Sequence, residues 1–409
     1  MIRLIFFAAL LLHQSFSLRM HEKFSWKYLD YNWPSLEHRT FALSRGLYQP
    51  ENNIILGVER WKNMLFVTVP RWRLGVPSSL NFIELPNWEK SPRLNPYPSW
   101  EESSILPYPT EATIVSTYRV QVDKCDRLWV IDNGVDNLLD QPKSIVPPAI
   151  VIFDLNRHQL IRRFVLPQNQ LKNDTFLPNI VIDSSKYNCE DTHAYVTDAG
   201  SFGIIVYSFK KNKSWRIQHS FFHIDPTAGG FSIADTYFTW RDGVFGIALG
   251  HLRSDFSRDL FFHSLSATKE FVVPNKVLQN ESLAMSTDPA HGEFRIVGDR
   301  GPGGHSATEV FDKNTDVIFF TQLAKDGIGC WNIQTPLNEY TAVLVDQDPI
   351  ALIMPVDIKL DDDGYIWVLS NRMAHFIKKQ MNFADYNFRI VVAKASELIK
   401  GTFCDVIYY

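Results

Sequence analysis

Two histidines and two arginines have side chains that could support proton transfer. His251 and His305 lie in expected loops beside apolar runs, and histidine exchanges a proton most readily near neutral pH. Arg71 and Arg300 could stabilise negative charge on a substrate oxygen. A loop histidine is also commonly a plain surface residue, and no spacing forces these four side chains together. They are candidates for catalysis without a recognised catalytic pattern behind them.

Known catalytic and metal-binding signatures are absent from the sequence. There is no Gly-x-Ser-x-Gly, His-Glu-x-x-His, phosphate-binding loop or Cys-x-x-Cys. Gly301-Pro302-Gly303-Gly304 reads as a tight loop, because its proline removes an amide donor. Asp361-Asp362-Asp363-Gly364 lacks the spacing of a calcium loop and is better read as a hairpin turn. We expect neither a cofactor nor a metal site.

A second group of polar residues stands at the ends of apolar runs. Asp132, Asn133, Asp198 and Asn371 end such runs, and Asp357 lies nearby. If the runs converge on one axis, the two aspartates could hold a cation or an amine there. Alternatively, these side chains cap strands or bond to turn amides, as aspartate commonly does.

The elements that would position these residues are short β-rich runs, each preceded by polar residues. The runs begin 49 to 73 residues apart, about 60 on average, which suits one four-stranded propeller blade with its loops. They are 65–69, 128–132, 194–198, 244–248, 317–321 and 366–370. Residues 18–409 accommodate about six such repeats, no low-complexity linker divides them, and no long amphipathic helix is evident. We therefore predict an all-β fold, a six-bladed β-propeller forming a single domain; a pair of β-sandwiches is the alternative.

The N-terminus resembles a secretory signal. Arg3 precedes an uncharged apolar stretch over residues 4–12, and Ser15 and Ser17 provide the small residues that signal peptidase reads. We predict a signal peptide over residues 1–17 and a secreted, extracellular chain. No later run is long enough to cross a bilayer, so no membrane association is expected.

In a secreted chain, the four cysteines are expected to form disulfides and three sequons become candidate glycosylation sites. Cys125, Cys189, Cys330 and Cys404 form an even set, for which two disulfides in one of three connectivities are expected. Asn173, Asn212 and Asn280 head Asn-x-Ser/Thr sequons and are candidate glycosylation sites. The formal net charge of −4 offers no strong positive field, so nucleic acid is an unlikely partner class.

Several longer motifs, in order along nearly the whole chain, carry a family resemblance. The chain resembles the insect yellow and major royal jelly protein family, and its yellow branch in particular. The matching segments are 26–31, 66–72, 75–77, 96–100, 122–132, 245–250, 299–302, 330–332, 361–373 and 387–389. The resemblance implies a six-bladed propeller and the disulfide pairs Cys125–Cys189 and Cys330–Cys404.

The resemblance also implies where a ligand would bind. Some salivary members of the family bind biogenic amines in the channel through a threonine, an asparagine and an aromatic residue. These positions fall on Val356, Asn371 and Met373. Only Asn371 matches, because Val356 lacks the hydroxyl and Met373 lacks the aromatic face that would meet an ammonium group. Trp129, Phe320, Trp331 or Trp367 could line such a channel, but strand aromatics more often form the blade core.

Other yellow-like relatives act in melanin and cuticle formation, and some convert dopachrome. Because the sequence lacks a recognisable catalytic constellation, we favour a secreted, non-catalytic yellow-like propeller that binds a small aromatic amine or catechol in its channel, in pigmentation or cuticle biology. The first alternative is a dopachrome-converting isomerase, in which His251 or His305 would move a proton and Arg71 or Arg300 would bind the quinone oxygens. The second alternative is a structural or storage protein without a ligand. Nothing in the sequence indicates an oligomeric state.

Overall fold

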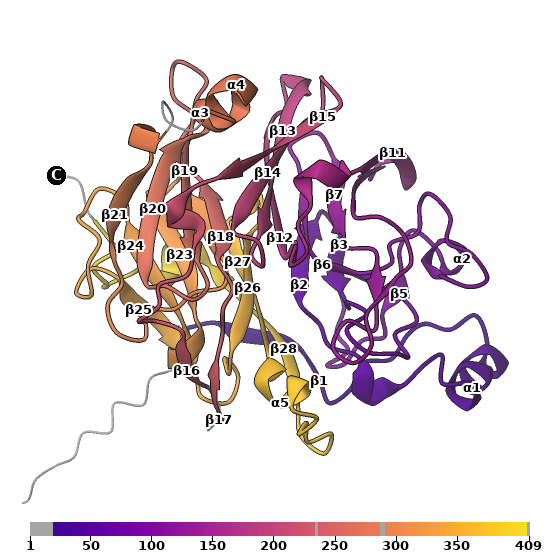
Figure 1. Cartoon of the computed structure of the whole chain (residues 1–409). Coiled ribbons are helices and arrows are strands. Elements are labelled where there is room, and N and C mark those ends of the chain that lie inside the picture. The colour runs from indigo at the N-terminus through magenta and orange to yellow at the C-terminus, as the bar shows by residue number, and fades with distance from the viewer. Residues whose placement is uncertain (1–18, 234–235, 287–290, 407–409) are drawn as a thin grey trace, which may run out of the picture.

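A computed structural model describes residues 19–233, 236–286 and 291–406 of the chain. Six four-stranded antiparallel sheets stand around a common axis, so the predicted six-bladed propeller is confirmed (Figure 1). The innermost strand of each sheet packs against the innermost strands of the two neighbouring sheets, which closes the ring. The expected signal peptide, residues 1–17, lies outside the described residues.

Each blade runs from the axis outward. Blade one comprises β2 (Gly57–Trp61), β3 (Met64–Thr68), β4 (Leu80–Glu84) and β5 (Asn95–Pro96); blade two comprises β6 (Thr117–Val122), β7 (Arg127–Asp132), β10 (Ala149–Asp154) and β11 (Gln159–Val165). Blade three comprises β12 (Asn179–Ser185), β13 (Asn188–Asp198), β14 (Gly203–Ser208) and β15 (Lys213–Gln218); blade four comprises β18 (Val244–Leu249), β19 (Asp259–Ser264), β20 (Lys269–Pro274) and β21 (Arg295–Asp299). Blade five comprises β22 (Glu309–Asp312), β23 (Val317–Gln322), β24 (Gly327–Asn332) and β25 (Val343–Gln347).

Blade six joins the two ends of the chain. Its inner strands are β26 (Pro355–Leu360), β27 (Tyr365–Asn371) and β28 (Phe388–Lys394), and its outer strand is β1 (His21–Trp26). β1 pairs antiparallel with β28, from His21 opposite Val392 to Trp26 opposite Phe388. Because a strand from the N-terminus completes a sheet from the C-terminus, backbone hydrogen bonds hold the ring shut.

The remaining elements are short and lie in loops. Two hairpins are formed by β8 (Val135–Asp136) with β9 (Lys143–Ser144) and by β16 (Gly230–Ile233) with β17 (Thr236–Thr239). The helices are α1 (Leu36–Ser44), α2 (Trp100–Ser103), α3 (Asn275–Gln279), α4 (Glu281–Ala284), α5 (Met373–Ile377) and α6 (Ala395–Leu398). Single 3₁₀ turns occur at Pro50–Asn52, Gln168–Gln170, Ser220–Phe222, His291–Glu293 and Leu323–Lys325.

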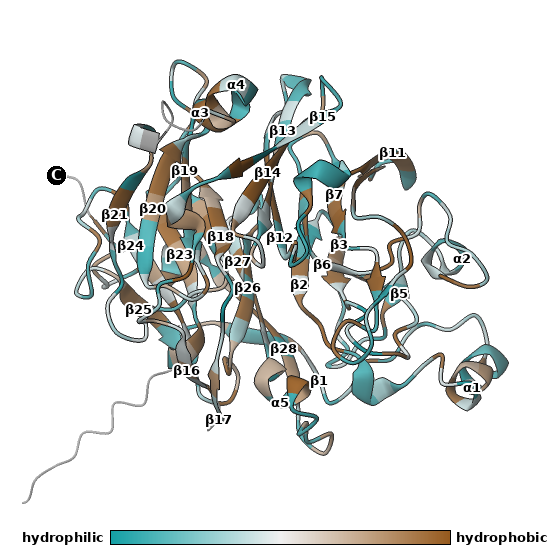
Figure 2. Cartoon of the chain, viewed as in Figure 1, coloured by the Kyte–Doolittle hydropathy of each residue, from teal (hydrophilic) through white to brown (hydrophobic). Residues whose placement is uncertain are grey.

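The apolar runs of the sequence occupy two kinds of position. Five of the six lie wholly or mostly in the second strand of a blade, which neighbouring blades bury on both faces; β3 and β7 are buried at every residue. Such strands read as continuous apolar runs rather than as alternating ones. The fourth run, residues 244–248, instead forms the innermost strand β18. In Figure 2 the hydrophobic colour follows the strands of the blades, and the hydrophilic colour gathers in outer loops.

Both disulfides have the pairing that the family resemblance implies. Cys125–Cys189 joins the β6–β7 turn of blade two to β13 of blade three, and Cys330–Cys404 ties the C-terminal segment to β24. They close loops of 64 and 74 residues in sequence separation. Each contributes about 4 kcal/mol in the loop-entropy model. The three sequon asparagines, Asn173, Asn212 and Asn280, are exposed, as a glycan acceptor must be.

Candidate functional site

A pocket lies on the propeller axis where the innermost strands begin. Residues at or next to the start of all six innermost strands line it, so the pocket is the mouth of the central channel. These residues are Leu56, Tyr118, Arg119, Pro178, Phe245, Ala307, Met354 and Val356. Antiparallel pairing brings the ends of the second strands to this same end of the ring.

Aromatic side chains cover the mouth from the hairpin β16–β17 and the residue that follows it. Phe231 and Phe238 stack with ring centroids 5.6 Å apart, and Phe238 meets Trp240 edge-on at 5.3 Å. Figure 1 shows this hairpin and α5 at the same end of the propeller. Trp72 and Phe176 complete the wall, so the pocket is lined mainly by aromatic and aliphatic groups.

A buried ion pair spans the axis at the pocket wall. Arg119 of β6 and Asp357 of β26 lie 3.2 Å apart, and Arg119 also donates to the carbonyls of Val356 and Pro178. The second Asp357 oxygen accepts the Val58 amide at 2.9 Å. Both charged groups are fully engaged, so Asp357 is not available to hold a ligand cation.

Among the described residues, Asp242 is the one carboxylate that lines the pocket, and it also lines the adjoining groove. It directly precedes the Gly243 that leads into β18. Burial raises the pKa of Asp242 to about 6, although a hydrogen bond from Trp240 lowers it in part. Among the described residues, no lysine or arginine forms an ion pair with Asp242, although Arg241 and Lys378 line the same groove.

The pocket is narrow inside and opens into a wider groove. The inner cavity has about 30 Å³ of free space, room for a water molecule or two. The neighbouring groove has about 390 Å³ and shares Phe238, Trp240 and Asp242 with the cavity. Its other walls are Thr239, Arg241, Ala374, Ile377 and Lys378. A small molecule would therefore meet Asp242 first from the groove.

Of the three ligand positions implied by the family resemblance, two line the pocket and one does not. Val356 and Met373 line the pocket. Asn371 is buried beside it: its amide donates to the Ile55 carbonyl at 2.7 Å, and its oxygen accepts the Met373 amide. Asn133 makes the same kind of link between blades, because it exchanges hydrogen bonds with the Leu177 backbone. The side chains of both asparagines thus bond to the next blade.

Asp132 and Asp198 lie at the channel-mouth end of the ring, but they end second strands rather than innermost ones. The Asp132 carboxylate accepts backbone amides from Val115, Ser116 and Gly134, and it pairs with Arg163 at 2.8 Å. The Asp198 carboxylate accepts amides from Phe176 and Ser201 and pairs with Arg216 at 2.7 Å. Neither lines the pocket, and both have the strand-capping arrangement that the sequence left as an alternative.

The four candidates for catalysis are not brought together. His251 contacts Asp316 at 2.5 Å in loops at the far end of the ring. Arg71 is buried and donates to carbonyls of Val115 and Val76. Arg300 pairs with Glu270 at 2.5 Å between blades four and five.

His305 lies closest to the pocket of these four side chains. Its ring centroid is 4.3 Å from that of Phe231, and its Nε2 contacts the Ala228 carbonyl at 2.7 Å. Burial lowers the pKa of His305, so the ring is neutral near pH 7. The imidazole packs against Phe231 of the hairpin, but it does not line the pocket.

Sequence reasoning missed the aromatic residues that form the mouth. Trp129, Phe320, Trp331 and Trp367 belong to hydrophobic clusters of the blades. The pocket aromatics come instead from loops, from the hairpin β16–β17 and from the starts of the innermost strands β6 and β18. Asp242 is one of the polar residues that precede the fourth run, and its sequence position alone does not distinguish it. Spacing did not single this run out, because the 50 residues before it are matched by 49 before the run at 366–370, which lies in a second strand.

Helices of the described residues include none that is both long and apolar enough to cross a membrane. Among solved structures, virginiamycin B lyase from Staphylococcus aureus covers 83% of this chain and 95% of its own at a TM-score of 0.42 and 11% identity. That likeness is too distant to bear on function.

Comparisons of sequence are decisive for the family. The family model described as Major royal jelly protein matches residues 115–404. A Drosophila melanogaster protein named Dopaminechrome tautomerase is 36% identical over 96% of this chain and 87% of its own length. Protein yellow of Drosophila melanogaster is 36% identical over 95% of this chain and 71% of its own length. The chain therefore belongs to the yellow and major royal jelly protein family.

Proposed function

We propose that this protein is a secreted propeller that binds a small aromatic amine of the catecholamine type at the mouth of its channel, in pigmentation or cuticle biology. One observation carries the proposal: Asp242, a carboxylate without an ion-pair partner among the described residues, stands in a pocket built of aromatic rings. Aromatic rings attract both a flat ring and an ammonium group, and a carboxylate neutralises the ammonium charge.

The shape of the mouth determines how such a ligand would sit. Small-molecule sites usually have about 300–1,000 Å³, and the groove beside Asp242 has about 390 Å³. A ligand would place its ammonium group at Asp242 and its ring against Phe238 and Trp240. Deeper entry requires the hairpin β16–β17 to shift, since Phe231 and Ile233 line an inner cavity with only about 30 Å³ of free space.

Secretion is part of the proposal. Two disulfides occur, and disulfides persist in oxidising compartments. The N-terminal signal pattern and three exposed sequons agree with passage through the secretory pathway. Glycosylation at Asn173, Asn212 and Asn280 is expected to show as a mass loss after enzymatic deglycosylation of the secreted protein.

Isothermal titration calorimetry of the secreted protein tests the proposed binding. Dopamine, octopamine, serotonin and dopa are the probes. We expect micromolar or tighter binding of at least one amine, weakened at least 30-fold, or about 2 kcal/mol, by Asp242→Asn. Asp362→Asn, an exposed aspartate in the turn between β26 and β27, is the matched control and should bind as the wild type does. The absence of heat with all four probes would contradict the proposal.

Tautomerisation of an aminochrome is a second candidate, favoured by the pKa of Asp242 near 6. A carboxylate with that pKa can act as a general base near neutral pH. It would remove a proton from a ring carbon, the electrons would pass into the quinone, and a proton would be returned to a quinone oxygen, so that the composition of the molecule is unchanged. Arg241 and Lys378 in the groove could stabilise the negative charge on the quinone oxygens. The relative named Dopaminechrome tautomerase supports this candidate.

Loss of aminochrome absorbance measures this second activity. With dopaminechrome as substrate, we expect Asp242→Asn to lower kcat at least 100-fold, as loss of a general base does. Asp362→Asn should retain the wild-type rate. A wild-type rate equal to the spontaneous conversion would exclude catalysis and leave the binding proposal intact.

A further inference from the structure

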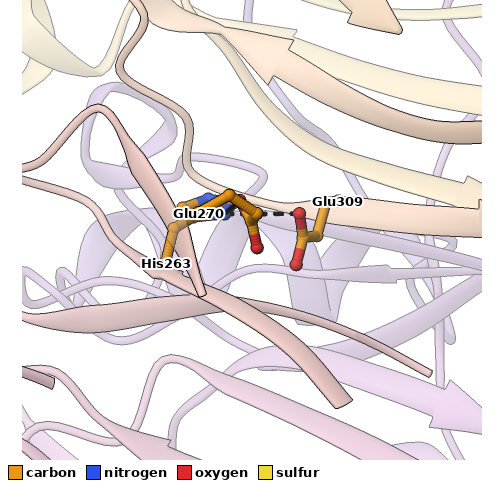
Figure 3. Close-up of side chains that lie close together, drawn as sticks. All are labelled: His263, Glu270 and Glu309. Atoms are coloured by element: carbon orange, nitrogen blue, oxygen red, sulfur yellow. Dashed lines mark hydrogen bonds and ion pairs between the residues drawn. The ribbon is translucent and has the colours of Figure 1, made fainter. Parts of the chain in front are cut away.

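A second group of ionisable side chains is sealed between blades four and five. His263 of β19, Glu270 of β20 and Glu309 of β22 point toward one another (Figure 3). The side chains are at most 2% exposed, and Arg300 beside them is equally buried. None of the four lines the channel mouth or the groove.

Distances within this cluster fit the ligand shell of a single ion. His263 Nδ1 lies 3.0 Å from Glu270 Oε2 and 3.3 Å from Glu309 Oε2. Metal bonds of about 2.1 Å, at tetrahedral or octahedral angles, place neighbouring ligand atoms about 3.0–3.4 Å apart. The three side chains each offer one ligand atom, and these atoms all lie within 4.8 Å of one another. An ion could therefore bind with small side-chain movements.

Several oxygens of the cluster have no hydrogen-bond partner among the described residues. Oε1 of Glu309 and Oε1 of Glu270 are buried in this condition, and Oε2 of Glu309 has only its 3.3 Å contact with His263 Nδ1. Buried polar atoms of native proteins nearly always bond to protein, water or an ion. An isolated buried carboxylate is costly unless a cation faces it. The unpartnered Oε1 atoms of Glu270 and Glu309 thus point to an occupant of the cluster.

Charge within the cluster leaves room for one more cation. Two carboxylates face one guanidinium, because Arg300 Nη1 lies 2.5 Å from Glu270 Oε2. When His263 is neutral, as an imidazole that binds a metal is, one negative charge of the cluster is left without a counter-ion. A bound cation would face that charge.

Two neighbouring features hold the ligands in place. Arg300 Nε donates to the Gly304 carbonyl at 2.7 Å, which fixes the guanidinium that binds Glu270. Gly246 of β18 makes room for the imidazole, because a Cβ added there would lie 2.3 Å from His263 Nε2. These contacts position the side chains of Glu270 and His263 within the cluster.

We propose that His263, Glu270 and Glu309 bind one divalent transition metal ion, Zn²⁺ or Mn²⁺, which joins blade four to blade five. One imidazole nitrogen with two carboxylates is a donor set for these ions, whereas Ca²⁺ takes six to eight oxygens. The sequence offered no spacing signal for the site, because the ligands lie on three strands of two blades. The proposal does not depend on the ligand at the channel mouth.

The metal content of the secreted full-length protein tests this inference. The chain would be produced with Zn²⁺ or Mn²⁺ in the medium, washed with EDTA and measured by inductively coupled plasma mass spectrometry. We expect about one ion per wild-type chain and at least a tenfold lower content in Glu309→Gln. The matched control is Glu59→Gln, which alters another buried glutamate on an innermost strand, paired with Lys359. This control should keep the wild-type metal content.

Two results would overturn the proposal: a wild-type chain without stoichiometric metal, or equal metal in Glu309→Gln and the wild type. If Glu309→Gln is not secreted, anomalous scattering from wild-type crystals grown with Zn²⁺ replaces it. A peak bounded by His263 Nδ1 and the two carboxylates would support the site, and the absence of a peak there would contradict it.

Discussion

Asp132, Asp198 and Asp242 all lie at the channel-mouth end of the ring, and their partners separate them into two kinds. Asp132 and Asp198 each accept backbone amides and face an arginine at 2.7–2.8 Å. Asp242 has no ion-pair partner among the described residues and borders both the cavity and the groove. The first two carboxylates are fully used in holding their blades, whereas the third retains capacity for a ligand.

This difference follows from where the chain places each carboxylate. Asp132 and Asp198 end second strands, where arginines of the outermost strands β11 and β15 reach them. Asp242 stands just before an innermost strand, among aromatic rings that exclude water and donate few hydrogen bonds. The same residue type therefore serves structure in one place and is free for recognition in the other.

The largest effect is expected from removing a structural carboxylate. Asp198→Ala should lower the free energy of unfolding by about 3–5 kcal/mol, because Arg216 is left buried without its counter-ion. Urea unfolding measures the loss, and Asp362→Ala should change stability by less than about 0.5 kcal/mol. A loss below 1 kcal/mol in Asp198→Ala would remove the distinction drawn between Asp198 and Asp242.

A smaller effect is expected from pH, and it should depend on Asp242 alone. With a pKa of about 6, Asp242 ionises between pH 5 and pH 7, while an alkylammonium ligand stays charged. Dopamine affinity should therefore rise about tenfold over this range. The pKa is raised above its unfolded value of about 3.8, so the folded state holds the extra proton and its stability falls as pH rises through 4 to 6.

Calorimetric titrations at pH 5, 6 and 7 measure this dependence. In Asp242→Asn the affinity should be low and flat with pH. A rise of the same size in the variant would assign the titration to another group.

The smallest effect is expected from restoring a hydroxyl to the pocket wall. Val356→Thr places an acceptor beside the mouth and should tighten amine binding three- to tenfold, or about 1 kcal/mol. Val345→Thr, in the core of blade five, is the matched control and should lose stability without a change in affinity. Equal affinities in Val356→Thr and the wild type would show that the ammonium group does not reach Val356.

Much of the fold could be predicted from the sequence because blade strands have a local signature. Strands such as β7 are buried on both faces, so apolar runs recur once per blade. Closure by β1 was not evident, since His21–Trp26 is half exposed and pairs with a strand more than 360 residues away. The run at 244–248 has the same apolar pattern as the other five runs, although it forms an innermost strand. The pattern alone therefore does not tell innermost strands from second strands.

The site was harder to predict because its residues are far apart in the sequence and come together only when the ring of blades closes. The family resemblance pointed to the channel as the place of the site, and Val356 and Met373 do line the pocket there. Sequence alone could not show that Asp132 and Asp198 find arginines, since Arg163 and Arg216 lie 31 and 18 residues further along. The sequence also could not show that Asp242 forms no ion pair with any described arginine or lysine.

A side-by-side titration of dopamine into Asp242→Asn and Asp198→Asn tests the central distinction most directly. Both proteins would be studied by calorimetry at pH 7, below their unfolding temperatures, with thermal unfolding measured in parallel. We predict that Asp242→Asn loses affinity at least 30-fold without a loss of stability, and that Asp198→Asn loses stability but binds dopamine as the wild type does. Unchanged affinity in Asp242→Asn, or loss of affinity in a folded Asp198→Asn, would contradict the assignment of Asp242 as the ligand-binding carboxylate.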